Sequence, residues 1–239
     1  EDKGQWAMIF NETVKSDSNP VDRTEKFMFD GERLIQHIIK QRYFEEEINN
    51  EVNLSYSDNQ VTVTTDYLTL VYTLNSEGYA SQCVYSLSSQ NRIYQFSYSA
   101  EGYLTGIVEN IDDTEYSSTS LTYENGDITS ISSKMNGLEN KFIYEPGEES
   151  STYHLPCLGL LEIHPLTFHI EALYAGLLGK DPRHFTMHSC PAGSNDEKTV
   201  YSYGFDKKGN PSRMICQTTY AGGQANYYPY TRNISISFE

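Results

Sequence analysis

The chain carries little positive charge. It has 17 Lys and Arg against 33 Asp and Glu, a formal net charge of −16 over 239 residues. Nucleic-acid binding depends on clustered Lys and Arg that neutralise phosphates, and attraction to an anionic membrane surface depends on the same residues. We therefore expect no nucleic-acid partner, and we expect membrane association only through a lipid anchor that is not present in this chain.

No apolar run is long and pure enough to predict a membrane-spanning helix. The longest apolar stretch, residues 158–178, contains Glu162, Pro165 and Glu171 among other polar groups, which are costly in the hydrocarbon core of a bilayer. The first residues, Glu1-Asp2-Lys3, are not followed by the apolar region of a signal peptide. We expect the chain to be soluble.

The common catalytic and cofactor-binding motifs are also missing. The sequence has no HExxH, GxSxG, Walker A or GxGxxG pattern, which are the signatures of zinc proteases, serine hydrolases and nucleotide-binding proteins. No CxxC pair is present, so neither a thioredoxin-like motif nor a zinc ribbon is supported. We expect no cofactor, no catalytic residues and a protein that is not an enzyme.

The four cysteines leave two alternatives open. An even number of cysteines permits two disulfides. Cys157 and Cys190 are the favoured pair if disulfides form, because they flank an unusual segment. Four unpaired and mostly buried thiols are the alternative, since a domain of this size folds without disulfides.

The sequence is rich in residues that favour β-structure. It has 20 Tyr and 10 Phe, and aromatic and β-branched residues are enriched in strands. Apolar residues alternate with Ser and Thr in several places, among them residues 61–63, 68–74 and 234–238. A period of two predicts strands with one buried and one more solvated face.

A strand–turn unit recurs along the chain. Its turns contain Gly or Asn at positions 31, 59, 78, 102, 126 and 147, as expected of tight hairpins that require a positive φ. Each unit has the length of one β-hairpin. The predicted fold is all-β: one domain, residues 1–239, forming a long antiparallel up-and-down meander that makes a strongly curved sheet or a partly or fully closed barrel.

Residues 157–190 interrupt this pattern. Leucines recur there at helical spacing. Pro165 suits the first position of a helix, and Gly179 followed by Pro182 suits its end. The sequence predicts one short amphipathic helix near residues 165–178, about three to four turns long, that packs its apolar side onto the sheet.

The order of these parts resembles one protein family. Units with Tyr or Phe before the turn, and Gly-Tyr-Leu or Gly-Asp-Ile after it, resemble the YD repeats of Rhs-type proteins. A meander of such units is followed by Leu177-Leu178-Gly179-Lys180-Asp181-Pro182-Arg183-His184 and then by Tyr201-Ser202-Tyr203-Gly204-Phe205-Asp206-Lys207-Lys208-Gly209-Asn210. This arrangement looks like the DUF4595 family over roughly residues 24–239.

The resemblance implies a porin-like β fold and an exported protein of Bacteroidetes-type bacteria. It implies a location in the periplasm, or at the outer membrane or cell surface as a lipoprotein. It implies no catalytic residues, because the family has no established activity.

Two groups of side chains are candidates for a functional site. Tyr227, Tyr228 and Tyr230 cluster in a stretch rich in Gly and Pro, and tyrosine rings stack on sugars and anchor interfaces. The alternative is that these tyrosines pack inward as part of a strand. If this stretch were helical, His184 and His188 would lie on one face and would be candidate ligands of a transition metal. The residues between them suit a strand equally well.

The sequence favours a non-enzymatic envelope protein that binds a glycan, a peptide or a protein partner of the envelope. Two alternatives stay open at this point. One is a carbohydrate-active hydrolase with two carboxyl groups roughly 5–9.5 Å apart. The other is a carrier that shelters an apolar ligand beneath the predicted helix, inside a half-closed barrel.

Overall fold

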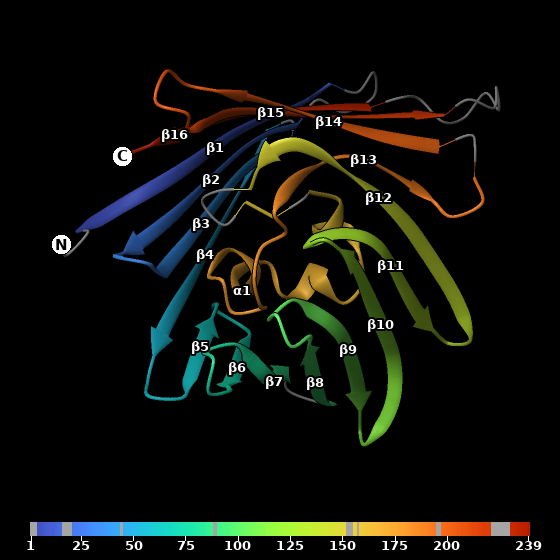
Figure 1. The fold of residues 1–239 in the computed structure, drawn as a ribbon. Helices are drawn as coiled ribbons and strands as arrows, with labels where there is room; N and C mark the ends of the chain where they lie inside the picture. The colour runs from blue at the N-terminus through green and yellow to red at the C-terminus, as the bar shows by residue number, and fades with distance from the viewer. Residues whose placement is uncertain are drawn as a thin grey trace. The chain divides into compact units, whose positions relative to one another are not determined.

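The computed structural model describes residues 4–15, 21–43, 45–87, 90–151, 155–156, 158–194, 197–220 and 230–239 (Figure 1). Its strands pair antiparallel with their neighbours in the chain, and β1 (Gln5–Lys15) also pairs with β16 (Tyr230–Phe238). The hydrogen-bonded strand order is therefore that of a closed barrel. This confirms the predicted all-β meander. Within the described ranges, no helix combines the length and apolar character that a membrane crossing requires.

The chain divides into two compact units, one of residues 1–52 with 187–239 and one of residues 53–186. The prediction of a single domain stays a prediction. The first unit contains β1, β16, most of β4 (Glu46–Tyr56) and β13 (His184–Pro191), and the complete strands β2 (Val21–Asp30), β3 (Arg33–Tyr43), β14 (Glu197–Phe205) and β15 (Pro211–Tyr220).

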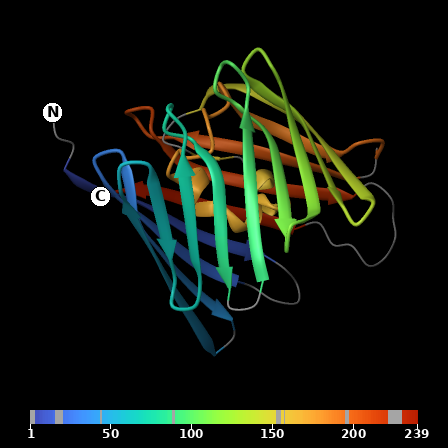
Figure 2. The same ribbon diagram turned by 90° about the horizontal axis from the view of Figure 1, so that it is seen from below.

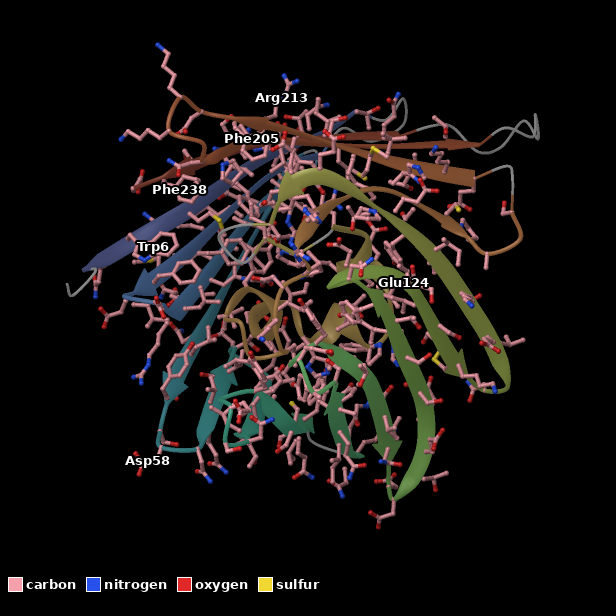
Figure 3. All side chains as sticks on the ribbon, viewed as in Figure 1. Trp6, Asp58, Glu124, Phe205, Arg213 and Phe238 are labelled. Atoms are coloured by element: carbon pink, nitrogen blue, oxygen red, sulfur yellow. The ribbon has the colours of Figure 1, made fainter. Side chains whose placement is uncertain are left out.

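Aromatic side chains form the core of the first unit. Phe27 and Phe29 of β2 are almost completely buried. The Trp6 ring stacks on Phe29 with 4.2 Å between ring centroids and lies 6.4 Å from the ring of Phe238 (Figure 3). Because Trp6 and Phe238 belong to β1 and β16, these contacts hold the two ends of the described chain together.

The second unit holds the hairpins that surround the insert. Its strands are β5 (Gln60–Thr64), β6 (Thr69–Leu74), β7 (Ala80–Leu87), β8 (Gln90–Tyr98), β9 (Leu104–Ile111), β10 (Thr114–Glu124), β11 (Asp127–Met135) and β12 (Leu138–Ser150). The alternation read from the sequence is confirmed, because Val61, Val63, Leu70 and Tyr72 are buried. Figure 2 shows the gold helical turns of the insert lying behind these teal and green strands.

Most of the predicted turns are confirmed. Gly31, Gly78, Gly102 and Gly126 all have a positive φ. The turn predicted at position 147 is wrong, because that position lies within β12. The turn before β12 is made by Asn136 and Gly137, whose φ values of 51° and 77° are those of an Asn-Gly hairpin turn.

The insert is less helical than predicted. In place of one helix of three to four turns it has two 3₁₀ turns, η1 (Leu158–Glu162) and η2 (Leu166–Phe168), and one shorter helix, α1 (Ile170–Tyr174). His169 separates η2 from α1 because its backbone (φ −123°, ψ 31°) is not helical. The helix ends before Gly179, because Gly176 adopts φ 71° and the N–H of Leu177 donates to the carbonyl of Ala172, as in a Schellman motif.

Residues 177–184, the exit segment, leave the insert and run along three successive hairpin turns. The Leu177 carbonyl accepts a hydrogen bond from the N–H of Ala80 at 2.7 Å. Lys180 N–H donates to the Gly102 carbonyl at 2.9 Å, and Arg183 N–H donates to the Gly126 carbonyl at 3.0 Å. The exit segment thus bonds to one hairpin turn at every third residue.

This register follows from two standard lengths. Hairpin turns on one edge of a meander are two strands apart, which is about 9.6 Å, and three extended residues span about 10 Å. Gly179 brings the backbones together, because a Cβ at this position would lie 2.7 Å from the Gly102 carbonyl oxygen. The exit segment therefore matches the spacing of the hairpins that it crosses and ties their turns together.

We predict that Gly179→Ala lowers the free energy of unfolding by about 2–4 kcal/mol, through strain at positive φ and a backbone clash. Gly78→Ala is the matched control, because Gly78 has φ +83° but an added Cβ would meet nothing within 4 Å. The control should lose about 1 kcal/mol, the cost of the backbone strain alone. Chemical denaturation of the two variants measures the difference, and equal losses would contradict the close approach.

Candidate functional site

A pocket opens beside the exit segment, where it crosses the β8–β9 and β10–β11 hairpins. Its volume is about 750 Å³, within the size range of small-ligand sites. The end of β10, marked by Glu124 in Figure 3, lies next to it. Its lining is mixed, with the tyrosines Tyr103 and Tyr123, the polar residues Ser99, Thr105, Thr122 and Asn125, the charged residues Glu101, Lys180 and Arg183, and Leu121 and Gly126.

Tyr103 and Tyr123 form the aromatic part of this pocket. Their rings stack with 5.0 Å between centroids and 27° between planes. Burial raises the pKa of the Tyr123 hydroxyl above its ordinary value, and the charge of Asp181 adds to the effect. The hydroxyl therefore stays protonated, so the pair offers apolar faces together with a hydrogen-bonding group.

Lys180 and Arg183 supply positive charge to the same pocket. Both side chains are exposed. The Arg183 guanidinium donates to the Asn125 carbonyl oxygen at 3.4 Å, and neither cation forms an ion pair with any residue that the structure describes. Among the described residues that line the pocket, Glu101 is the one carboxylate, so two cations and one anion line this pocket of a strongly acidic protein.

A buried cluster around Glu109 of β9 anchors the insert to the sheet. The Glu109 carboxylate accepts hydrogen bonds from Tyr94 at 3.1 Å and Ser117 at 2.8 Å, and it contacts His164 Nε2 at 2.5 Å. Arg92 lies 3.5 Å away. Burial raises the pKa of Glu109, but the hydrogen bonds from His164 and Ser117 outweigh it and lower the pKa below its ordinary value. The carboxylate is thus a fully partnered anion, which suits an anchor.

His169 forms a second buried contact between the insert and the sheet. Its side chain is inaccessible to solvent, and its Nδ1 lies 2.7 Å from the Tyr72 hydroxyl. Burial raises the pKa of Tyr72, so its hydroxyl stays protonated in this contact. The ring of Tyr94 stands perpendicular to the imidazole at 4.4 Å, and His169 Nε2 has no hydrogen-bond partner among the described residues. Burial lowers the pKa of His169 to about 3.

The cavity beneath the insert is small. It measures about 30 Å³ and is lined largely by leucines, among them Leu104, Leu121, Leu160 and Leu166. A space of this size holds about one water molecule. At this place the insert and the sheet therefore leave no room for an apolar ligand.

The tyrosine cluster predicted from the sequence lies mostly outside the described residues. This applies to Tyr227 and Tyr228. Tyr230 begins β16, where its backbone pairs with Thr218, but its side chain is also outside the described part. The prediction that these tyrosines bind a ligand stays a prediction.

The predicted histidine pair lies in a strand. His184 and His188 both belong to β13, and residues four apart in a strand are not neighbours as they are in a helix. His184 Nδ1 contacts Asp127 Oδ2 at 2.8 Å, and the backbone N–H of His184 donates a hydrogen bond to Asp127 Oδ1. Within the described ranges, no group of three His, Cys, Asp or Glu side chains is arranged to hold a metal ion.

The favoured cysteine pair is described only in part. Cys190 is a free thiol, whereas Cys157 lies outside the described residues. Cys83 is also a free thiol, and burial raises its pKa to about 12. Such a thiol has almost no thiolate near neutral pH and behaves as a small apolar residue.

A model of the family described as "Domain of unknown function (DUF4595) with porin-like fold" matches residues 27–213. The chain belongs to the DUF4595 family. This confirms the resemblance inferred from the hairpin repeat and the exit segment. No curated protein matches the sequence.

Two solved structures are similar to this DUF4595 chain. A porin-like protein from Bacteroides uniformis ATCC 8492 shares 27% identity and a TM-score of 0.87, over 98% of this chain and 96% of the other. A porin-like protein from Bacteroides vulgatus ATCC 8482 shares 12% identity and a TM-score of 0.58, over 96% of this chain and 97% of the other. The second likeness shows a common fold alone.

The sequence contains a signal for the pocket. The exit segment, which carries the resemblance to the family, has Lys180 and Arg183 three positions apart. Tyr103 stands directly after Gly102, in the Gly-Tyr-Leu of the repeat. What was missing was the register, because the exit segment and the turns lie far apart in sequence and meet only through long-range backbone hydrogen bonds.

We predict that His169 makes the protein sensitive to acid. A depressed pKa stabilises the fold fully above the ordinary histidine value of 6.5, and this contribution is lost as the pH falls toward 3. The loss between pH 7 and pH 4.5 is about 2–3 kcal/mol from this group. His169→Gln keeps an acceptor for Tyr72 and cannot titrate, so denaturation curves should show a weaker pH dependence. Equal slopes for the variant and the wild type would contradict the assignment.

Proposed function

We propose that this DUF4595 protein is a non-enzymatic binding protein that holds a carbohydrate in the Tyr103–Tyr123 pocket. The observation that carries the proposal is the stacked tyrosine pair in a pocket of about 750 Å³. Hydroxyl and amide groups of Ser99, Thr122 and Asn125 line the same space. Flat apolar rings surrounded by hydrogen-bonding groups match the alternating apolar and hydroxylated surfaces of a sugar.

Two observations favour binding over the alternatives. Glycoside hydrolysis needs two carboxyl groups that flank the bond to be broken, and Glu101 is the one carboxylate in the lining of this pocket. A carrier of apolar molecules needs a sizeable apolar cavity, and the cavity beneath the insert measures about 30 Å³.

We also propose that the protein is exported and acts in the cell envelope, in the periplasm or at the cell surface. The likeness to a porin-like protein from Bacteroides uniformis supports this location. In such a location a soluble binding protein meets polysaccharides of the envelope and the surroundings. Fractionation of cells that express the full-length precursor tests it, and recovery in the cytoplasm alone would overturn it.

We predict that Tyr103→Ala and Tyr123→Ala each weaken saccharide binding about tenfold, the typical loss of an aromatic anchor. Screening on an array of neutral and acidic oligosaccharides selects the ligand, and titration calorimetry measures its dissociation constant. The control is Tyr67→Ala, which removes a tyrosine that is 70% exposed and lies outside the pocket. If the array yields no ligand, or if all three variants bind like the wild type, the proposed function is wrong.

A further inference from the structure

The same arrangement of side chains occurs at two successive hairpin turns. At Gly102, an added Cβ would lie 3.5 Å from Lys180 Cε and 3.3 Å from the Tyr79 ring. At Gly126, an added Cβ would lie 2.6 Å from Arg183 Cδ and 2.7 Å from the Tyr103 hydroxyl. In each case the stem of a cation crosses a glycine beside a tyrosine.

Each of these tyrosines is half of an aromatic pair. The Tyr79 and Tyr98 ring centroids are 5.3 Å apart, and the Tyr103 and Tyr123 centroids are 5.0 Å apart. Tyr79 and Tyr103 hold equivalent places in the repeat, directly after Gly78 and Gly102. The second unit therefore has two similar candidate subsites, each with one aromatic pair and one cation. The pocket of about 750 Å³ is lined by the second pair and not by the first.

The two subsites are about 10 Å apart, because Lys180 and Arg183 bond to successive hairpin turns, which are two strands apart. A disaccharide of a linear polysaccharide spans about the same length. A polymer that carries one negative charge per disaccharide would therefore place its charges on the two cations. It would place its rings beside the two aromatic pairs.

The pocket lining holds more positive than negative side chains in spite of the net charge of the chain. Lys180 and Arg183 line it together with one described carboxylate, that of Glu101. Asp181 lines the adjoining small cavity, and its charge also acts on Tyr123. Charges farther away than about 8–10 Å are screened at physiological salt. The guanidinium of Arg183 also has the planar fork that pairs with a carboxylate.

We propose that this protein binds an acidic polysaccharide in which uronic acids alternate with neutral sugars, with carboxylates held by Lys180 and Arg183. The inference rests on the proposed carbohydrate-binding function and names its substrate class. A nucleic acid, which is charged at every nucleotide, fits two isolated cations on an acidic surface less well.

The test uses hyaluronan oligosaccharides, which alternate glucuronate with a neutral sugar, and the same oligosaccharides with their carboxylates methyl-esterified. We expect calorimetry to show tighter binding of the acid form. Raising the salt concentration should weaken binding of the acid form and leave the ester unchanged, because screening acts on the charge pairs. Chondroitin sulfate oligosaccharides distinguish a carboxylate site from one that prefers sulfate, and a preference for the sulfated chain would overturn the uronate assignment.

Lys180→Gln and Arg183→Gln should each weaken binding of the acid form up to about fivefold, as expected for exposed ion pairs. Both should leave binding of the ester unchanged. The backbone bonds of the exit segment survive both changes, because they use main-chain atoms. Lys134→Gln is the matched control, an equal change of charge on an exposed residue of β11 outside the pocket. Glu101→Gln should strengthen binding of the acid form.

The outcomes separate this inference from the proposed function. Equal binding of acid and ester, with no effect of salt, overturns the acidic class and leaves a neutral carbohydrate site standing. Binding of neither form, together with an empty array, overturns both. If a glutamine variant unfolds, the salt dependence of the wild-type protein decides the question.

Discussion

The second unit depends on a match between two lengths. Hairpins of an antiparallel meander repeat every two strands, and the exit segment advances by nearly the same distance every three residues. The Leu177 carbonyl and the amides of Lys180 and Arg183 therefore meet one turn after another. The backbone bonds tie neighbouring hairpin turns to one segment at the spacing that the sheet sets.

The same register explains why the pocket lies where it does. Side chains three residues apart on the exit segment fall on equivalent glycines of successive repeats, so Lys180 and Arg183 acquire similar surroundings. The side chains that anchor the insert to the sheet differ from these exposed cations. Glu109 and His169 are buried, partnered with His164 and Tyr72, and they hold the insert against the sheet. The buried polar contacts that hold the insert are thus separate from the exposed cations Lys180 and Arg183.

Much of the fold could be predicted from the sequence. Alternation of apolar residues and recurring Gly turns gave the meander, since both are local signals. The length of the helix was overestimated. The leucines of residues 165–178 are largely buried although most of the backbone between them is not α-helical. His169, whose backbone is not helical, divides the segment and contacts Tyr72. The pocket could not be predicted, because Tyr103, Tyr123 and Arg183 meet through pairings between distant segments. The binding of a ligand by Tyr227, Tyr228 and Tyr230 stays a prediction.

Hydrogen exchange with and without a hyaluronan oligosaccharide tests the central claim most directly, because it locates the ligand on the backbone. The account predicts slower exchange in peptides that cover the turns at 99–104 and 123–127 and the exit segment, and no change at the β14–β15 turn. Protection at the β14–β15 turn, with none along residues 177–184, would contradict it.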